Sequence, residues 1–334
     1  MFKNKTILIT GGTGSFGKSF LKKILNQKYQ FKKIIIFSRD ELKQHEMKIS
    51  NEFNEKKYRQ LRYFIGDVRD KERLQDALYD VDYVVHAAAL KQVSTGEYNP
   101  FEVIKTNIVG AQNLISGCLK SKVKKVIALS TDKAVSPVNL YGASKLCSDK
   151  LFISSNNIKG KKDLSFSVVR YGNVNGSRGS VIPFFKKINL SKKKLPLTHL
   201  EMTRFNISLK ESVKLVETAI QRGSHGEIFV PKLKSFYIRD LIHAISNKKN
   251  NYRIIGIRPG EKIHEELINP AESRNTVEFK NHYCILPNLT NEQLKKYCKK
   301  NNCKIVVKNF SYNSGTNRLF MNITDLKKTL NKPN

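Results

Sequence analysis

The chain has 334 residues, of which 40% are hydrophobic and 27% charged, so it is long enough for one large or two modest globular units. Lys and Arg number 61 against 28 Asp and Glu, which gives a net charge of +33 and favours anionic partners. Lysine is spread along the whole length, without a basic amphipathic helix or an arginine-rich arm. We therefore expect no nucleic-acid partner.

The sequence also lacks signals for a membrane, a metal or a disulfide framework. No run of about eighteen apolar residues is present, and Met1 leads into the first predicted strand without a signal sequence. The five cysteines are odd in number and have no Cys-x-x-Cys spacing. We expect a cytoplasmic protein with reduced thiols, no transmembrane segment and no metal site.

Short apolar runs alternate with helical patterns through the first half of the chain. Such alternation predicts βαβ units around a parallel sheet. The predicted fold class is α/β, a Rossmann-like doubly wound parallel sheet with a smaller α/β substrate-binding lobe. The predicted strands are residues 6–9, 33–37, 61–65, 83–86, 126–129 and 166–170.

The alternation loosens after Tyr171 into Gly-, Pro- and Lys-rich stretches. Residues 229–230 and 254–257 are apolar enough to return a strand to either part of the chain. The predicted domains are a Rossmann domain over 1–171, a substrate-binding lobe over 172–287 and a C-terminal segment over 288–334 that carries no motif.

A glycine-rich turn follows the first predicted strand and opens a helix. Bare backbone at such a turn lets a pyrophosphate approach the helix N-terminus. Its position between a strand and a helix predicts a dinucleotide site. The residues assigned to this site are Thr10, Gly11, Thr13, Gly14, Ser15, Phe16 and Gly17.

The end of the second predicted strand indicates which dinucleotide is bound. NAD sites usually carry a carboxylate there for the ribose hydroxyls, whereas this chain reads Ser38-Arg39-Asp40. Arg39, with Lys43 one helical turn later, suits a 2′-phosphate, so NADP is favoured and Asp40 keeps NAD as the alternative. Further predicted cofactor contacts are Asp67 and Val68 at the adenine, and the small residues Ala87, Ala88 and Ala89 beneath the cofactor.

The stretch from Ser130 to Lys145 carries groups suited to acid–base chemistry. Asp132 and Lys133 follow an apolar strand, and side chains at the carboxyl end of such a strand face the binding crevice of an open α/β sheet. Tyr141 and Lys145 lie four residues apart on one helix face, so the ammonium lowers the phenol pKa and can hold a ribose hydroxyl. Such a phenol takes a proton from a sugar hydroxyl as hydride leaves. The set is typical of a sugar-modifying enzyme.

These residues resemble the extended short-chain dehydrogenase/reductase superfamily. Within it, the chain is similar to the soluble inverting UDP-N-acetylglucosamine 4,6-dehydratases of pseudaminic acid biosynthesis and their capsule-pathway relatives, over roughly residues 4–287. Lys133 is the residue that best distinguishes this group, because retaining hexose dehydratases carry Glu at that position. The resemblance is carried by Thr10 to Gly17, His86 to Val93, Asn107 to Gly110, Ser130 to Lys133, Tyr141 to Lys145, Met202 to Phe205 and Gly256 to Leu267.

The resemblance implies the removal of water from UDP-N-acetylglucosamine, with hydride passing from C4 to NADP and back to C6. The cofactor is then tightly bound and regenerated in each turnover, and the product is a UDP-2-acetamido-2,6-dideoxy-hexos-4-ulose. In this scheme Lys133, an amine of lowered pKa, is the base at C5, and Asp132 is the acid at the C6 hydroxyl. Tyr141 and Lys145 act at the C4 oxygen and the cofactor.

The resemblance also implies further contacts. Lys91 and Asn107 join the cofactor site, and Arg204 and Arg258 are suited to grip the diphosphate. A closed homo-oligomer, often of six subunits, is implied as well. The implied substrate contacts are Lys91, Thr131, Asn173, Gly179, Ser180, Val181, Pro183, Thr198, Met202, Arg204, Arg258 and Glu261.

Three other functions remain open. A capsule-type enzyme would also epimerise C5, and sequence does not place the group that returns the C5 proton. A 4-epimerase needs only Tyr141 and Lys145 and has no use for Asp132 and Lys133. A non-catalytic NADP-sensing protein would be expected to have lost these side chains. Departures at Ser94-Thr95-Gly96 and Phe205-Asn206 from the family pattern leave the exact sugar open.

Overall fold

We describe the chain from a computed structural model, which covers residues 2–26, 29–54, 56–177, 179–191, 193–248 and 250–331. It forms two compact units that interleave along the sequence. Neither unit is therefore one continuous stretch, and the predicted boundaries after residues 171 and 287 stay predictions. The first unit is Met1–Ser130, Ser144–Val169 and Val213–Phe229, and the second is Thr131–Ala143, Arg170–Ser212 and Val230–Asn334.

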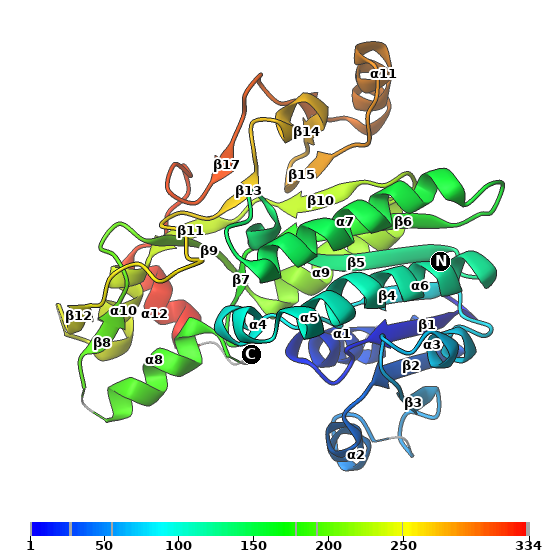
Figure 1. The fold of residues 1–334 in the computed structure, drawn as a ribbon, viewed down its shortest axis with the longest axis horizontal. Coiled ribbons are helices and arrows are strands. Elements are labelled where there is room, and N and C mark those ends of the chain that lie inside the picture. The colour runs from blue at the N-terminus through cyan, green and yellow to red at the C-terminus, as the bar shows by residue number, and fades with distance from the viewer. Residues whose placement is uncertain are drawn as a thin grey trace. The chain divides into compact units, whose positions relative to one another are not determined.

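The first unit is built on a parallel sheet with β1 near its middle (Figure 1). β1 pairs in parallel with β2 and β4, β2 with β3, β4 with β5, and β10 with β6. The order β10-β6-β5-β4-β1-β2-β3 is doubly wound, which confirms the predicted fold class. The strands are β1 (Thr6–Thr10), β2 (Lys33–Ser38), β3 (Leu61–Ile65), β4 (Tyr83–His86), β5 (Lys125–Thr131), β6 (Ser165–Tyr171) and β10 (Ile228–Pro231).

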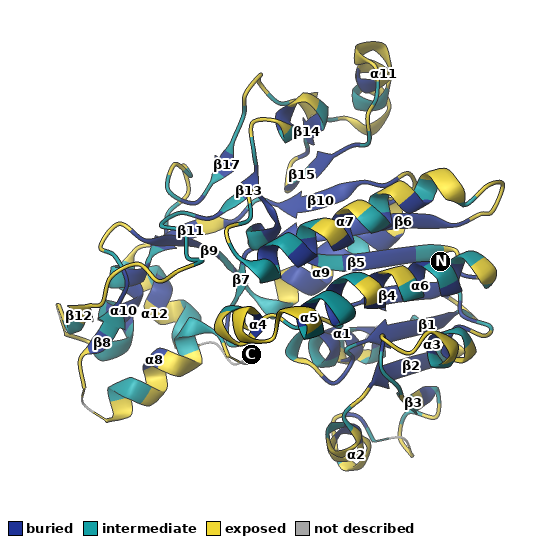
Figure 2. Cartoon of the chain, in the orientation of Figure 1, coloured by how far each residue is buried: buried dark blue, intermediate teal, exposed yellow. Residues whose placement is uncertain are grey.

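Helices cover both faces of this sheet, so its central strands are apolar on both sides. Every residue of β1, β4 and β6 is buried, which is the continuous apolar pattern of a covered parallel sheet. Figure 2 shows these strands buried and the outer faces of α6 and α7 partly exposed. The helices are α1 (Ser15–Asn26), α2 (Glu41–Ile49), α3 (Lys71–Ala77), α4 (Val93–Tyr98), α5 (Pro100–Ile104), α6 (Gly110–Lys120), α7 (Leu140–Ile158) and α9 (Leu209–Arg222).

Local signals set where several of these helices begin. The Asp40 side chain accepts a hydrogen bond from the Lys43 backbone at the start of α2, and Asp70 does the same from Arg73 at the start of α3. Between α5 and α6 the chain forms a π-helical turn, η1 (Lys105–Val109), which contains the buried Asn107. Such turns recur at functional sites.

The second unit contains small sheets, short helices and the antiparallel strands β14, β15 and β16, which belong to the large sheet. β9 pairs with β7 in parallel and with β11 in antiparallel fashion, while β12 pairs with β8 and β13 with β17. Within 254–257, only residue 254 is in a strand, at the end of β12. The strands are β7 (Asn173–Val174), β8 (Leu195–Leu197), β9 (Thr203–Ile207), β11 (Lys234–Tyr237), β12 (Tyr252–Ile254), β13 (Glu266–Ile268), β14 (Thr276–Glu278), β15 (His282–Ile285), β16 (Lys304–Ile305) and β17 (Tyr312–Asn313).

Three helices of the second unit, α8, α10 and α12, pack on a shared apolar cluster. Phe185 from α8, Leu241 from α10 and Leu326 from α12 are each almost fully buried in it. Burial of such side chains contributes about 1.5–3 kcal/mol each. The helical elements are η2 (Asp132–Ala134), α8 (Val181–Leu190), α10 (Ile238–Ser246), η3 (Glu272–Asn275), α11 (Asn291–Asn301) and α12 (Ile323–Asn331). Among the described residues, no helix is both long and apolar enough to cross a membrane.

Candidate active site

The glycine-rich turn has the geometry that a dinucleotide pyrophosphate needs. Gly11 has φ +64, and a Cβ there would lie 2.9 Å from the backbone of Ala87 and Ala88. Gly14 N donates to Gly11 O at 2.9 Å, and Ser15 then begins α1. Only glycine fits at position 11, so the bare backbone at the N-terminus of α1 fits a pyrophosphate.

A buried hydrogen bond joins this turn to β4. Thr10 Oγ1 lies 2.8 Å from His86 Nδ1 and accepts hydrogen bonds from the backbone N–H groups of Ala87 and Ala88 at 3.2 and 3.3 Å. Burial lowers the pKa of His86 to about 3, and the nearby Lys145 ammonium contributes in the same direction. His86 is therefore a neutral, packed side chain that orders the ends of β1 and β4.

The end of β2 presents one exposed cation and one engaged carboxylate. Arg39, with a side chain 54% exposed, lies 3.8 Å from Asp67 at the end of β3. Asp40 caps α2 and also pairs with the Lys43 ammonium. The buried Ser38 Oγ accepts from Gln44 Nε2 at 3.0 Å. The carboxylate that would bind the ribose hydroxyls of NAD thus has local partners, whereas the Arg39 guanidinium reaches solvent.

The remaining residues assigned to the cofactor lie along the same edge of the first unit. Thr13 and Val68 are buried, and Ala87 and Ala88 are half-buried. Although burial opposes it, hydrogen bonds from Arg69 hold the pKa of Asp67 below its ordinary value. Ala89 and Lys91 are exposed, and Phe16 and Gly17 lie in the first turn of α1.

Asn107 holds the loop that follows β4. Its Oδ1 accepts from Leu90 N and its Nδ2 donates to Leu90 O, both at 2.9 Å. Its Nδ2 also lies 3.0 Å from Ser144 Oγ on α7. The π-helical turn η1 thereby fixes both the loop that carries Lys91 and the helix that carries Lys145.

Tyr141 and Lys145 lie on α7, one turn apart, as predicted. Lys145 is 4% exposed, and burial lowers its pKa against the opposing charge of Asp149. Asp149 is in turn held by Ser130 Oγ at 2.6 Å.

In the second unit, Asp132 and Lys133 follow β5 in η2, where they form a charged cluster with Glu265 and Arg204. Lys133 Nζ lies 3.1 Å from Asp132 Oδ1 and 3.2 Å from Glu265 Oε1. Arg204 Nε lies 3.7 Å from the same Glu265 oxygen. The Asp132 side chain is fully buried, and its Oδ2 has no hydrogen-bond partner among the described residues. One carboxylate oxygen of Asp132 is thus available for a substrate.

The charges in this cluster set the protonation of Asp132 and correct one expectation about Lys133. Burial raises the pKa of Asp132, as suits an acid that must hold its proton, and the Glu265 carboxylate adds to this against Lys133. Burial alone would lower the pKa of Lys133, but Asp132 and Glu265 outweigh it and raise that pKa. The lowered pKa expected for Lys133 is therefore wrong: two carboxylates favour its ammonium form.

Of the other residues assigned to the substrate, Lys91 lies in the first unit and the rest lie in the second. Thr131 Oγ1 donates to Asp132 Oδ1 at 3.0 Å. Asn173 Oδ1 and Ser180 Oγ are buried without a hydrogen-bond partner among the described residues, as groups awaiting a polar ligand would be. Gly179 precedes Ser180, and Val181 and Pro183 lie in the first turn of α8. Thr198 and Met202 are buried and lie in the segment that joins β8 to β9.

The two arginines expected to grip a diphosphate differ in setting. Arg204 is 8% exposed, and its Nη1 donates to the carbonyl oxygens of Thr203 and Ile263. The Arg258 side chain is 55% exposed and lies 3.8 Å from Glu261. Arg258 can therefore turn toward a ligand, while Arg204 is held within the charged cluster.

Sequence reasoning missed Glu265 and the C-terminal residues that hold it. Glu265 stands inside the motif from Gly256 to Leu267, in which the resemblance implies substrate contacts only for Arg258 and Glu261. Ser314 exchanges two hydrogen bonds with Glu265, although the C-terminal segment carries no recognisable motif.

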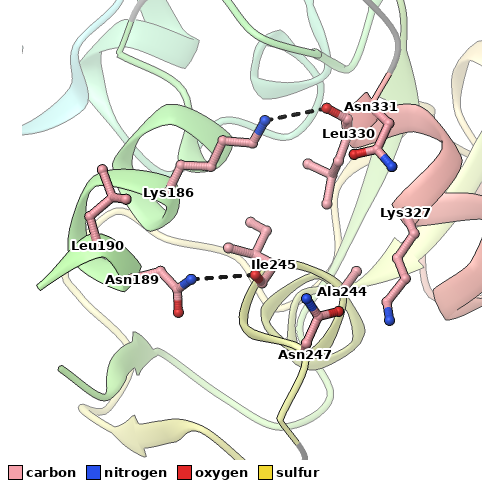
Figure 3. A pocket seen from close by; sticks show the side chains of 9 residues that line it. All are labelled: Lys186, Asn189, Leu190, Ala244, Ile245, Asn247, Lys327, Leu330 and Asn331. Carbon is pink, nitrogen blue, oxygen red and sulfur yellow. Dashed lines mark hydrogen bonds between the residues drawn. The ribbon is translucent and has the colours of Figure 1, made fainter. Parts of the chain in front are cut away.

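A cavity of about 390 Å³ opens among α8, α10 and α12, and it contains none of the predicted site residues. Figure 3 shows Lys186 reaching Leu330 and Asn189 reaching Ile245 across it. Among the described residues, no group of His, Cys, Asp and Glu side chains could hold a metal ion.

The doubly wound sheet, the glycine-rich turn and the Tyr141–Lys145 pair on α7 define a member of the extended short-chain dehydrogenase/reductase superfamily. The chain belongs to the polysaccharide biosynthesis protein family, whose sequence pattern matches residues 7–287.

Comparison with known proteins gives three informative relatives. The chain is 53% identical over 342 residues to the inverting UDP-N-acetylglucosamine 4,6-dehydratase of Campylobacter jejuni, covering 99% of this chain and 98% of that one. It is 43% identical over 335 residues to UDP-glucose 4-epimerase of Rickettsia bellii, covering 99% and 96%. The X-ray structure of Pen from Bacillus thuringiensis matches with a TM-score of 0.87 and 37% identity over 98% of both chains.

Proposed function

We propose that this chain is a UDP-N-acetylglucosamine 4,6-dehydratase that inverts C5 and yields a UDP-2-acetamido-2,6-dideoxy-hexos-4-ulose. The single observation that carries the proposal is the contact of Asp132 and Lys133 at 3.1 Å in a buried setting. The inverting 4,6-dehydratase of Campylobacter jejuni, 53% identical, supports the same reaction.

The relative named as a 4-epimerase makes epimerisation the second candidate. An epimerase moves hydride at C4 alone, so it needs a phenol and a lysine at that carbon. It has no proton to remove from C5 and no hydroxyl to expel from C6. A buried acid touching a lysine amine, Asp132 with Lys133, therefore favours dehydration.

The proposed roles follow from the chemistry of each group. A bound nicotinamide supplies reversible hydride storage, from C4 and back to C6. Tyr141 takes the proton of the C4 hydroxyl, aided by the positive charge of Lys145 one turn away on α7. The C4 ketone acidifies C5, whose proton Lys133 takes, while Asp132 gives its proton to the C6 oxygen, which leaves as water.

NADP is the proposed cofactor, with NAD as the alternative. Arg39 is exposed at the end of β2, and a planar guanidinium suits a phosphate. Asp40, which would otherwise bind the ribose hydroxyls, caps α2 and pairs with Lys43. We further propose that the product serves surface-glycan synthesis of the pseudaminic acid type and that the protein acts as a homo-oligomer.

The proposal is tested by proton NMR of the purified protein with UDP-N-acetylglucosamine in D2O, without added reductant. The wild type should produce a 6-methyl signal that is not split by a C5 proton, because C5 carries deuterium, and the ring couplings should report inversion. Lys133→Ala should lose this product. Lys327→Ala, on the exposed face of α12, is the matched control and should keep it.

Each alternative gives a different spectrum. Conversion to a C4 epimer without a methyl signal would establish the epimerase instead. A methyl product with both C5 configurations would support the capsule-type enzyme, and a product with fully retained C5 configuration would contradict inversion. If the protein has cofactor bound but gives no turnover, the substrate assignment is wrong and a non-catalytic NADP-sensing protein is favoured.

A further inference from the structure

Glu265 is a buried carboxylate that the proposed reaction does not yet use. It is 2% exposed, and its Oε1 lies 3.2 Å from Lys133 Nζ and 3.7 Å from Arg204 Nε. Its Oε2 has no hydrogen-bond partner among the described residues. Burying such a charge costs several kcal/mol unless it is paired, so its placement against Lys133 needs a reason.

The reason lies in the proton that Lys133 and Asp132 share. At 3.1 Å the two groups can exist as ammonium and carboxylate or as neutral amine and carboxylic acid. The two carboxylates favour the ammonium form of Lys133 at rest, and transfer of its proton to Asp132 gives the neutral pair, which has both a base for C5 and an acid for the C6 oxygen. When the C5–H bond breaks, its proton goes to Lys133 Nζ and the Asp132 proton leaves with water. Lys133 then carries a positive charge and Asp132 a negative one.

We propose that Glu265 is a positioning residue whose carboxylate holds Lys133 Nζ beside Asp132 and stabilises the ammonium that forms as Lys133 takes the C5 proton. This inference rests on the proposed dehydratase function and deepens it. A preplaced charge of this kind acts where charge develops in the transition state, and it needs no reorganisation during the reaction.

The charges around Glu265 keep it ionised. Burial opposes ionisation, but Lys133, Arg204 and Lys262 together hold the pKa of Glu265 below its ordinary value. Lys262 donates to Val135 O at 2.6 Å, and burial lowers its own pKa. Lys133 thus faces two carboxylates, Asp132 and Glu265, and the Arg204 cation.

The C-terminal segment holds Glu265 in place. Glu265 N donates to Ser314 Oγ, and Ser314 N donates to Glu265 O, both at 2.8 Å. Ser314 is fully buried, and its Oγ lies 2.7 Å from Thr203 Oγ1. A Cβ at Gly315 would lie 2.6 Å from His264 Nδ1, so the chain packs closely here. Glu265 immediately precedes β13 and Ser314 immediately follows β17, so the antiparallel pairing of these two strands holds Ser314 beside Glu265.

The test compares Glu265→Gln with Glu266→Gln, its neighbour at the start of β13, whose Oε1 accepts from Ser311 at 2.6 Å. Glutamine keeps the shape of the side chain and removes its charge. In Glu265→Gln, kcat should fall about 10- to 100-fold, the range of a lost charge-assisted hydrogen bond, while KM changes little. In single turnover the reduced nicotinamide should form at the wild-type rate and then accumulate, because C5 deprotonation is slowed.

A second measurement does not depend on turnover. An amine-selective acylating reagent modifies only neutral lysine, so Lys133 should be labelled several-fold faster in Glu265→Gln at the same pH, while Lys145 is not. Glu266→Gln should match the wild type in both assays. Ser314→Ala should shift both readouts in the same direction but less, because it removes the hydrogen bond from Glu265 N and leaves the charge of the Glu265 side chain in place.

The results separate the two proposals. Unchanged labelling of Lys133, or equal slowing of nicotinamide reduction and of product formation, would overturn the role of Glu265. If Lys133 is labelled faster in Glu265→Gln but the wild type makes no methyl product, the contact with Glu265 is supported and the dehydratase function is rejected.

Discussion

Lowering the pH should destabilise the first unit through His86, the histidine at the end of β4. It is 1% exposed and bonded to Thr10 beside the glycine-rich turn. Burial lowers its pKa from the ordinary 6.5 to about 3. Above the ordinary value both the folded and the unfolded chain carry a neutral imidazole. Below it the unfolded chain binds a proton that the folded chain does not, so stability is lost as the pH falls.

The size of the effect follows from the shift. Each pH unit between the two pKa values changes the free energy of unfolding by about 1.4 kcal/mol. Between about pH 6.5 and about pH 4.5 His86 alone should therefore remove about 2–3 kcal/mol. The full shift corresponds to about 5 kcal/mol, reached only near the folded-state pKa.

Urea unfolding of the wild type and of His86→Gln across this pH range measures the effect. Glutamine retains a group that can hydrogen-bond to Thr10 and cannot be protonated, so it removes only the titration. The wild type should lose about 2–3 kcal/mol more than the variant over these two pH units. Parallel pH profiles for the two proteins would refute the reasoning, because the other titrating groups are common to both.

Two further predictions concern an ion pair and the cofactor. Glu272→Ala removes the carboxylate from Arg170, which is 1% exposed and bonded at 2.9 Å, and should cost about 3–5 kcal/mol in urea unfolding. The half-exposed Lys232–Glu278 pair is the control, and Glu278→Ala should cost less than about 1 kcal/mol, so equal losses would contradict the argument. Arg39→Ala should weaken NADP binding about 10- to 100-fold in calorimetry and leave NAD binding unchanged, and equal weakening of both would speak against a 2′-phosphate contact.

The alternation of apolar runs predicted the sheet of the first unit well, because its signals are local. The run at residues 126–129 is the interior of β5, and the run at 33–37 lies within β2. Strands of a covered parallel sheet are apolar on both faces, so they can be recognised without knowing their neighbours. The glycine-rich turn around Gly11 could also be recognised from the sequence. In the structure, the positive φ of Gly11 and its approach to Ala87 exclude any side chain there.

The second unit was harder to predict because its strands are short and its chain segments come from separate parts of the sequence. Residues 131–143 belong to it, whereas 213–229 return to the first unit. A strand of two residues such as β17 leaves no periodic pattern to detect. Its pairing with β13, which brings Ser314 to Glu265, depends on tertiary contacts alone.

By itself the sequence determined which chemical groups are present: a glycine turn for a pyrophosphate, a tyrosine and lysine one turn apart, and the acid and amine of Asp132 and Lys133. Tertiary structure decided the charge state of that amine. Lys133 meets Glu265 at 3.2 Å across a long stretch of sequence, and this contact, with Asp132, raises its pKa instead of lowering it. Charge interactions depend on distance in space and on burial, and neither can be calculated from the order of residues along the chain.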